Sequence, residues 1–464
     1  MAKELIPASD WQVLVTKKRA QLDAQILAEW RLSEYFLASI PASERLIEDD
    51  VVRRSGILTD EELDITENYS AKELLSRLAC GDMSSLEVTA AFCKRAAIAN
   101  QLTSCLTEHF FKMALKRARF LDDYLRKEKR VIGPLHGLAI SIKDSFCVED
   151  IQSTVGYVSL LTKEPAALNS ALVEMLLDLG AVLYVKTNVP QTMMTADSDN
   201  NIFGRTLNPH NTHLTAGGSS GGKGALIAFH GLILGISTDS AGSIQIPALC
   251  CGVYSFKPTT DCIPWGGQVA NLAMEGLLGL KPAAGLLAHS LSNMDLFMLT
   301  MLGGEPWKYN VTSSAALGIL TIGVLPEDPH FLLHPPVQQA LNSTINALID
   351  AGHCIPMVPS MAKVLSAMFT GLFPVDMELP PYEEINALHK ARQQYTNAWR
   401  RVWVERGLDV VLGPGAQNTA VLHDTYGWPP YTLIWNLLDY PACIIPSRRF
   451  RKVLIVLLIM AGIL

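Results

Sequence analysis

Short apolar runs alternate with helical segments and glycine-rich turns from Gly133 onward, and this alternation constrains the fold more than any other feature. The predicted elements are strand 138–142, helix 170–179, strand 181–187, helix 224–229 and strand 232–238. Strands that alternate with helices favour a parallel or mixed sheet covered on both faces. A second helix–strand alternation covers 318–325, 337–351 and 409–412. We therefore predict an α/β fold with one large, twisted, mixed sheet that continues toward the C-terminus.

The segment before Gly133 is predicted to be helical scaffold. Residues 1–65 carry no chemical signal and form an N-terminal helical extension. Two capping boxes follow, Ser70 with Glu73 and Ser84 with Glu87, and each opens a stretch with apolar residues at helical spacing. A further amphipathic stretch from about residue 108 to 126 predicts another helix.

Composition excludes several classes of protein. The 464 residues are 49% hydrophobic and 18% charged, with a net charge of 38 − 45 = −7. This profile excludes a disordered chain and a basic nucleic-acid arm, so we expect no nucleic-acid partner. The nine cysteines are scattered without metal-ligand spacing, which indicates a reducing, cytoplasmic location and predicts no metal site. A homodimer is compatible with these features.

The C-terminal end is unusual. A basic cluster at 448–452 precedes twelve apolar residues at 453–464, whereas a membrane-spanning helix needs about 20. The run could be a buried strand, an interfacial segment or a misread ending. We expect membrane association only if it is a genuine anchor.

Three turns carry the candidate chemistry, because ligands of such sheets lie where strands end. The first is Ser141 to Ser145, which contains Lys143. The second is the glycine and serine loop 217–222, and the third is 238–243, which ends at Ser243.

The middle loop has three interpretations when taken alone. Gly217 to Lys223 matches a phosphate-binding loop except at its last position, where Gly224 replaces the hydroxyl residue that holds magnesium. Gly217-x-Ser219-x-Gly221 also fits a nucleophile elbow, although none of the eleven histidines stands in a motif that selects it as a partner. The third interpretation is an ordinary glycine-rich turn before a helix.

Taken together, the three turns resemble the amidase signature family, in the branch typified by acetamidases and fatty acid amide hydrolase. The matching stretches are GPLHGLAISIKDSF (133–146), TNVPQTM (187–193), GGSSGGKGALIA (217–228), TDSAGSIQIPA (238–248) and CGVYSFKPTT (251–260). The resemblance covers roughly residues 60–446. It implies one catalytic domain over 66–446, the amidase signature fold, and an atypical tail at 447–464.

The resemblance implies a Ser-Ser-Lys triad with no cofactor and a small-molecule amide as substrate, whose acyl group is short aliphatic, aromatic or fatty. Ser243 is then the nucleophile, Ser219 the proton bridge with a cis peptide bond, and Lys143 the base. A lysine accepts a proton near pH 7 only if its pKa falls well below about 10.4, and the apolar strand 138–142 can desolvate it.

The remaining site residues follow from the same resemblance. Backbone N–H groups of Ser240, Ala241, Gly242 and Ser243 are expected to form an oxyanion hole. Met193 is expected either to line the acyl pocket or to pack in the core.

Three positions depart from the family. Ala241 replaces a glycine, and it strains the loop if that position needs a positive φ. Gln245 replaces an arginine and Lys223 replaces a glutamate, so that two charges have changed. If the two family residues interact, both ends of that interaction have changed.

These observations lead to one leading hypothesis and two alternatives. The leading one is an amidase that forms an acyl-enzyme and releases the acid and ammonia or an amine. The second is a catalytically impaired or truncated relative of the family. Because the sequence changes abruptly after residue 446, we predict a truncated or misread C-terminus. The third is a nucleotide-binding protein that uses Gly217 to Lys223.

Overall fold

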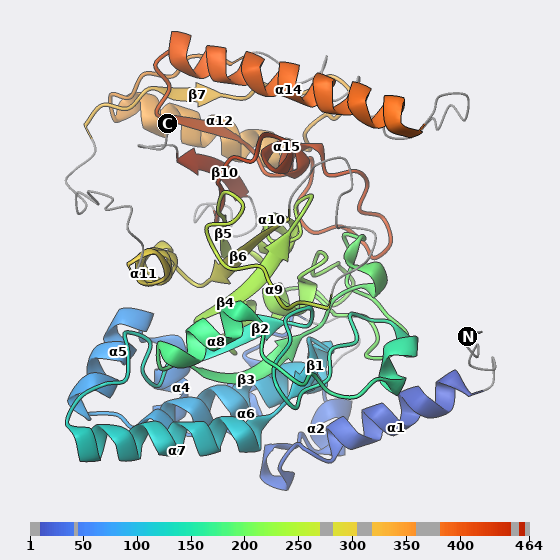
Figure 1. Ribbon diagram of the computed structural model, residues 1–464, viewed down its shortest axis with the longest axis vertical. Helices are drawn as coiled ribbons and strands as arrows, with labels where there is room; N and C mark the ends of the chain where they lie inside the picture. Colours follow the sequence, from blue (N-terminus) through green and yellow to red (C-terminus); the bar gives the residue numbers. More distant parts are fainter. Residues whose placement is uncertain are drawn as a thin grey trace.

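One mixed sheet organises the molecule. The computed structural model describes residues 10–40, 45–269, 282–303, 318–358, 381–446 and 454–459. In these residues ten strands are ordered β1-β3-β2-β4-β6-β5-β9-β10-β8-β7. Their bounds are β1 Leu106–His109, β2 Ala139–Lys143, β3 Val182–Thr187, β4 Leu234–Asp239, β5 Tyr254–Lys257, β6 Ala283–Ala288, β7 Ile322–Val324, β8 Val410–Pro414, β9 Ala442–Pro446 and β10 Leu454–Ile459. The sheet extends along the long axis of the molecule from β1 and β3 to β7 (Figure 1).

The pairing is mixed, as predicted. β3, β2 and β4 are parallel neighbours, and β7 is parallel to β8. The other neighbours pair antiparallel. The central strands β2 (AISIK) and β4 (LGISTD) are buried along their whole length. Each begins with apolar residues and ends on a charged residue.

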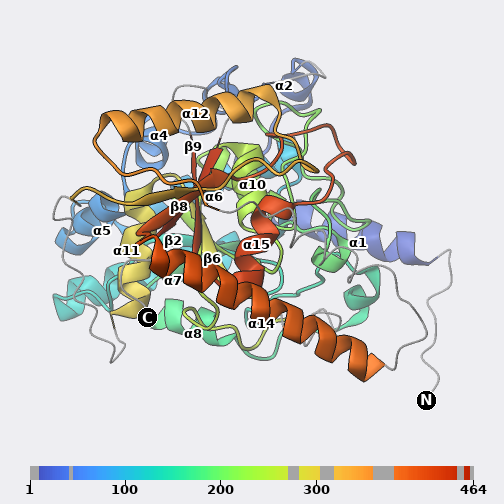
Figure 2. The ribbon, with the colours of Figure 1, turned by 90° about the horizontal axis from the view of Figure 1, so that it is seen from above.

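Helices cover the sheet. Before β2 lie α1 Trp11–Asp23, α2 Glu34–Ala38, α3 Val51–Arg54, α4 Asp60–Glu67, α5 Ala71–Cys80, α6 Ser85–Thr103 and α7 Phe111–Glu128. Later come α8 Ala171–Asp178, α9 Gly221–Ala228, α10 Gln245–Cys251, α11 Leu291–Leu302, α12 Pro335–Asp350, α14 Pro381–Glu405 and α15 Pro430–Leu438. Seen from above, α12 and α14 lie on opposite sides of the β8 end (Figure 2).

Both predicted capping boxes are confirmed. The side chain of Ser70 accepts a hydrogen bond at the start of α5 and that of Ser84 at the start of α6, each with its glutamate reciprocating. Asp122 of α7 also accepts from the backbone N–H of Ser85, at 2.6 Å, so a second helix supports this terminus. The N-terminal scaffold is therefore fixed by polar groups as well as by packing.

The prediction of one helix from about residue 108 is wrong at its start. Leu106–His109 forms edge strand β1, and the helix begins only at Phe111. Glu108 pairs with Lys186 on β3, and its carboxylate forms a buried ion pair with Lys18 of α1. Strand pairing and this long-range ion pair override the local helical pattern.

Part of the apolar tail forms a strand. β10 lies between β9 and β8 and pairs antiparallel with both, which agrees with the interpretation as a strand. Residues 447–453 and 460–464 lie outside the described residues, and the truncation hypothesis stays a prediction. No helix in the described ranges is long and apolar enough to cross a membrane.

Candidate active site

The three predicted turns meet at one edge of the sheet. Lys143 is the last residue of β2, and Ser243 follows the end of its parallel neighbour β4. Ser219 lies two residues before α9, in the glycine loop. Parallel neighbours end at the same edge, so the order of the strands brings residues 143 and 243 together although 100 positions separate them.

Lys143 contacts the bridging serine directly. Its Nζ lies 2.8 Å from Ser219 Oγ, 2.9 Å from Thr238 Oγ1 and 3.3 Å from the Thr238 carbonyl oxygen. The Gly218–Ser219 peptide bond is cis, as the resemblance implied. Ser219 is therefore hydrogen-bonded to an amine, whereas the serine of a nucleophile elbow needs a histidine.

The surroundings of Lys143 favour its neutral form. Its side chain is fully buried. Burial lowers the pKa of Lys143 from 10.5 to about 7, and the nearby Asp239 carboxylate opposes that shift. A neutral amine that contacts a serine hydroxyl can accept its proton near neutral pH.

A hydrogen-bonded chain holds the glycine loop. The backbone N–H of Gly217 donates to Thr215 Oγ1 at 2.9 Å, and that hydroxyl donates to Asp197 Oδ1 at 2.8 Å. The other oxygen of Asp197 lies 3.0 Å from His423 Nδ1. Ser198 Oγ also donates to the Gly217 carbonyl, at 2.9 Å. These hydrogen bonds connect the loop before Ser219 to His423, which lies far from it in the sequence.

The Asp239 carboxylate organises the turn that carries Ser243. Its oxygens accept from the backbone N–H of Gly242 at 2.6 Å and of Ile244 at 2.7 Å. The Asn436 side-chain amide of α15 donates to it at 2.9 Å. Asp239 is fully buried, and these donors offset the cost of burying its charge.

The expected oxyanion hole needs one correction. The N–H of Gly242 donates to Asp239, so it does not face a substrate. Within the described residues, no acceptor is recorded for the N–H groups of Ser240, Ala241 and Ser243. These three N–H groups are therefore not bonded to other parts of the described structure.

The condition for strain at Ala241, a positive φ, is not met. The positive φ of the turn belongs to Gly242, at +121°, and not to Ala241. A Cβ added to Gly242 would overlap the Thr432 hydroxyl and would lie 2.8 Å from Thr432 Cβ. The glycine that the backbone requires is therefore retained.

Ser243 is partly buried, and its hydroxyl makes no hydrogen bond within the described part of the chain. Ser219 and Ser243 are therefore not hydrogen-bonded to each other in the described residues.

Met193 packs in a small cluster apart from the main core. The buried members are Val155, Val189 and Met193, with Tyr157, Leu160 and Val269 against them. Thr192 and Met193 both have positive φ, at +71° and +56°. Such backbone conformations in non-glycine residues gather at functional sites.

Lys223 and Gln245, the two positions where the charge differs from the family pattern, are both buried. Lys223 is fully buried and its Nζ contacts Ser141 Oγ at 2.5 Å, so it does not face a phosphate at the loop surface. Gln245 Nε2 donates to Asp239 Oδ2 at 3.4 Å. No hydrogen bond joins Lys223 and Gln245 in the described residues.

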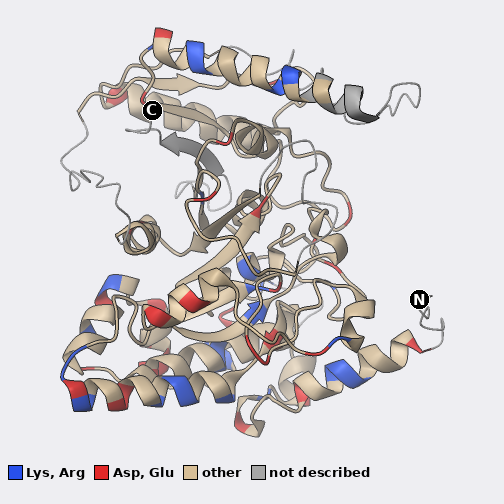
Figure 3. Ribbon diagram, viewed as in Figure 1, with Lys and Arg blue, Asp and Glu red and all other residues tan. Residues whose placement is uncertain are grey.

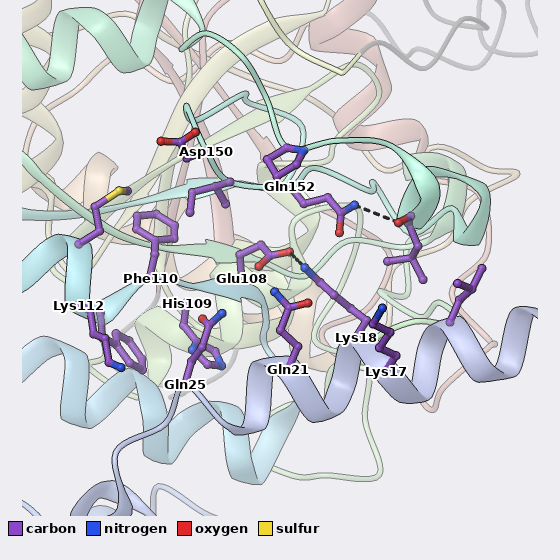
Figure 4. A pocket seen from close by; sticks show the side chains of 16 residues that line it. Lys17, Lys18, Gln21, Gln25, Glu108, His109, Phe110, Lys112, Asp150 and Gln152 are labelled. Atoms are coloured by element: carbon purple, nitrogen blue, oxygen red, sulfur yellow. Dashed lines mark hydrogen bonds and ion pairs between the residues drawn. The ribbon is translucent and has the colours of Figure 1, made fainter.

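A hollow of about 530 Å³ lies between α1 and the β1–α7 corner (Figure 4). Lys18, Glu108 and Phe110 line it, and none of the three candidate catalytic residues does. In the described ranges, no group of three or more His, Cys, Asp or Glu side chains could hold a metal ion.

Four supporting residues were not predicted. Thr238 and Asp239 lie in the stretch 238–248 that resembles the family, but the resemblance assigned them no role. Their position as polar residues at the end of a strand is the signal that could have identified them. Thr432 and Asn436 belong to α15, and Thr432 Oγ1 donates to the Ala241 carbonyl at 3.0 Å. No local pattern links them to a turn about 190 positions earlier.

Known proteins resemble this chain over most of its length. The family model described as Amidase matches residues 87–378. An amidase of Gibberella moniliformis is 39% identical, with 96% of this chain and 91% of that protein covered. An acetamidase of Emericella nidulans is 36% identical, with 94% and 86% covered. A solved structure of fatty acid amide hydrolase superposes with a TM-score of 0.83 at 28% identity, over 97% of this chain and 92% of that one.

Proposed function

Because this chain belongs to the amidase signature family, and is an amidase, we propose that it hydrolyses its amide through an acyl-enzyme on Ser243, with Ser219 as proton bridge and Lys143 as base. One observation carries the assignment of roles: the fully buried Lys143 amine lies 2.8 Å from Ser219 Oγ. This contact supplies a base for a serine without a histidine.

The first step is attack on the amide carbonyl. Ser243 Oγ bonds to the carbonyl carbon while its proton passes to Ser219, whose own proton passes to Lys143. For this transfer the Ser243 hydroxyl turns toward Ser219 once substrate is bound, because hydrogen bonds of unliganded sites often tighten only in the complex.

Negative charge then develops on the former carbonyl oxygen. The N–H groups of Ser240, Ala241 and Ser243 are the donors that we assign to it. Asp239 does not contact the oxyanion in this assignment. It accepts the hydrogen bond of the intervening Gly242 N–H and so fixes the conformation of the turn that carries the three donors. Fixed donors of this kind stabilise an oxyanion without reorganisation.

Collapse of the tetrahedral intermediate breaks the carbon–nitrogen bond. The nitrogen takes the proton held on Lys143 through Ser219 and leaves as ammonia or an amine. Water then attacks the Ser243 ester, again with the lysine as base, and the acid is released.

We assign the acyl group to the cluster around Met193. Val155, Val189 and Met193 form a buried apolar cluster outside the main core. The carbonyl of Thr195, two residues after Met193, lies against Gly218, the residue before Ser219. A screen of amides of increasing acyl length tests this: Met193→Ala should change the preferred length, and an unchanged preference would contradict the assignment.

The location we propose is cytoplasmic. All nine cysteines are free in the structure, which supports a reducing compartment.

Replacement of Lys143 tests the assigned base. We expect Lys143→Ala to lower kcat/KM by about three orders of magnitude or more, because the base and the serines act as one unit. Lys116→Ala, at an exposed position of α7, is the control and should leave kcat/KM unchanged. A loss of less than tenfold in a folded Lys143→Ala protein would refute the role.

A further inference from the structure

The Lys143 amine is held among oxygen atoms. Its Nζ lies 2.8 Å from Ser219 Oγ, 2.9 Å from Thr238 Oγ1 and 3.3 Å from the Thr238 carbonyl oxygen. All three residues are buried. Two of the three oxygens that this amine meets therefore belong to one residue, Thr238.

The hydrogens of a basic amine need acceptors of their own. A neutral lysine amine has two N–H groups and one lone pair, which point to three corners of a tetrahedron. To take a proton from Ser219, the lone pair has to face Ser219 Oγ. The two N–H groups then need other acceptors, because a buried donor that makes no hydrogen bond costs free energy. The hydroxyl and carbonyl oxygens of Thr238 fill these two places.

Thr238 reaches the amine from the strand next to that of the base. It belongs to β4, the parallel neighbour of β2, and it pairs with Ala284 of β6. This pairing fixes the backbone at residue 238, so any residue there would present its carbonyl oxygen. The hydroxyl oxygen, by contrast, depends on the side chain.

We propose that Thr238 is a positioning residue that accepts both hydrogens of the neutral Lys143 amine and so directs its lone pair at Ser219. The proposal rests on the proposed function of Lys143 as the base. Without the hydroxyl, the amine pairs both hydrogens by donating to Ser219 Oγ and the carbonyl oxygen. Its lone pair then faces away from the serine that it should deprotonate.

The protonated amine depends on the same hydroxyl. An ammonium group carries three N–H donors, which the three oxygens match. Loss of the hydroxyl leaves one donor of the ammonium without an acceptor, whereas the neutral amine can still pair both of its hydrogens. Such a loss therefore disfavours the charged form and lowers the pKa of Lys143 further.

The charged groups of this region stay the same when the hydroxyl is removed. Figure 3 shows acidic and basic residues in the middle of the molecule as well as on its outer helices. Asp239 favours the protonated form of Lys143. Lys223 of α9 is a second buried amine, and burial, followed by the nearby Lys143, lowers its pKa well below 10.5. Asp144 lies 3.4 Å from Lys186 Nζ.

The test is the rate of Ser243 labelling by a fluorophosphonate in the full-length protein, measured as a function of pH. In wild type the rate should rise through about pH 7, as Lys143 loses its proton, to a plateau. Thr238→Val keeps the shape of the side chain without the hydroxyl. Its rise should move to lower pH by about one unit, and its plateau rate should be about tenfold lower.

The direction of the shift separates orientation of the amine from packing. A packing defect that admits water would move the rise to higher pH, toward the ordinary pKa of lysine. Thr238→Ser keeps the hydroxyl, and both its rise and its plateau should stay close to wild type. Thr187→Val makes the matched change on β3 opposite Lys143, where the hydroxyl has no hydrogen-bond partner in the described residues, and should leave the profile unmoved.

Three results would overturn the proposal. They are a Thr238→Val profile that superposes on wild type or moves to higher pH, an undiminished plateau in that variant, and a Thr238→Ser protein that behaves like Thr238→Val. If Thr238→Val does not fold, Thr238→Ala removes the same acceptor and is held to the same two expectations. Wild-type protein that does not label at Ser243 would instead refute the proposed function.

Discussion

At the scale of single residues, the turn before Ser243 depends on Gly242. Its φ of +121° lies in a region that side chains rarely adopt, and its N–H is fixed by Asp239. The adjacent Ala241 has no such requirement. A methyl group is thus tolerated at one position and excluded at the next.

This contrast gives a prediction with a matched control. Gly242→Ala should lower kcat/KM at least a hundredfold, because the added Cβ overlaps the Thr432 hydroxyl and displaces the proposed oxyanion donors. Ala241→Gly should keep kcat/KM within a few-fold of wild type. Equal kcat/KM for both variants would contradict the assigned role of the turn.

Lys143 defines the expected pH dependence of catalysis. Because the base must be neutral to accept a proton and its pKa is lowered to about 7, kcat/KM should rise as the pH passes upward through about 7. A profile measured from pH 5 to 9 checks this. A rise centred near pH 10 would place the lysine in water-like surroundings and contradict the structure.

At the scale of elements, β10 is an interior strand of the sheet. It pairs with β9 on one side and β8 on the other, so both edges of the strand are hydrogen-bonded. Strands in such central positions do not accept proline, which lacks the N–H and restricts φ.

Substitution at Val456 tests that position. Val456 pairs with Gly413 of β8 and Ile444 of β9. Val456→Pro should lower the free energy of unfolding by about 1–3 kcal/mol or more, measured by urea denaturation, because a ladder hydrogen bond is lost and its acceptor is left unsatisfied. Val456→Thr keeps the N–H and a β-branched side chain, and should cost much less. Equal stability of the two variants would show that this segment does not pair within the sheet.

Elements with strong local patterns could be predicted from the sequence. The strands that end at Lys143 and Asp239 are buried along their whole length and begin with apolar residues, and the starts of α5 and α6 carry complete capping boxes. β1 could not be predicted, because Glu108 is held in a strand by partners on α1 and β3.

The contacts between residues far apart in the sequence that support the site could not be predicted from local patterns either. The catalytic candidates stand at strand ends and in a glycine-rich loop, where sequence reasoning looks for them. Thr432 and Asn436 reach the same turn from α15, and only the folded topology brings them there.

At the scale of the whole molecule, buried histidines link stability to pH. Burial lowers the pKa of His109 and His230 to about 4, and it lowers the pKa of His289 well below 6.5. The rings of His230 and His289 stack at 3.9 Å. In the unfolded chain each histidine takes up a proton near pH 6.5, whereas in the folded chain it stays neutral until much lower pH.

Stability should therefore fall as the pH drops from about 6.5 toward 4. Each histidine contributes a slope of up to about 1.4 kcal/mol per pH unit in that window, because the unfolded state binds more protons. Unfolding by urea at several pH values should show a smaller slope in His289→Gln than in wild type. Identical slopes in the two proteins would contradict neutral burial of His289.

The most direct test of the account is covalent labelling of Ser243. Wild-type protein treated with a fluorophosphonate should carry the label on the peptide that contains Ser243, and folded Ser243→Ala protein should carry none. Labelling of Ser219 instead, or no labelling of folded wild-type protein across pH 6 to 9, would contradict the proposed nucleophile and with it the Ser243–Ser219–Lys143 mechanism.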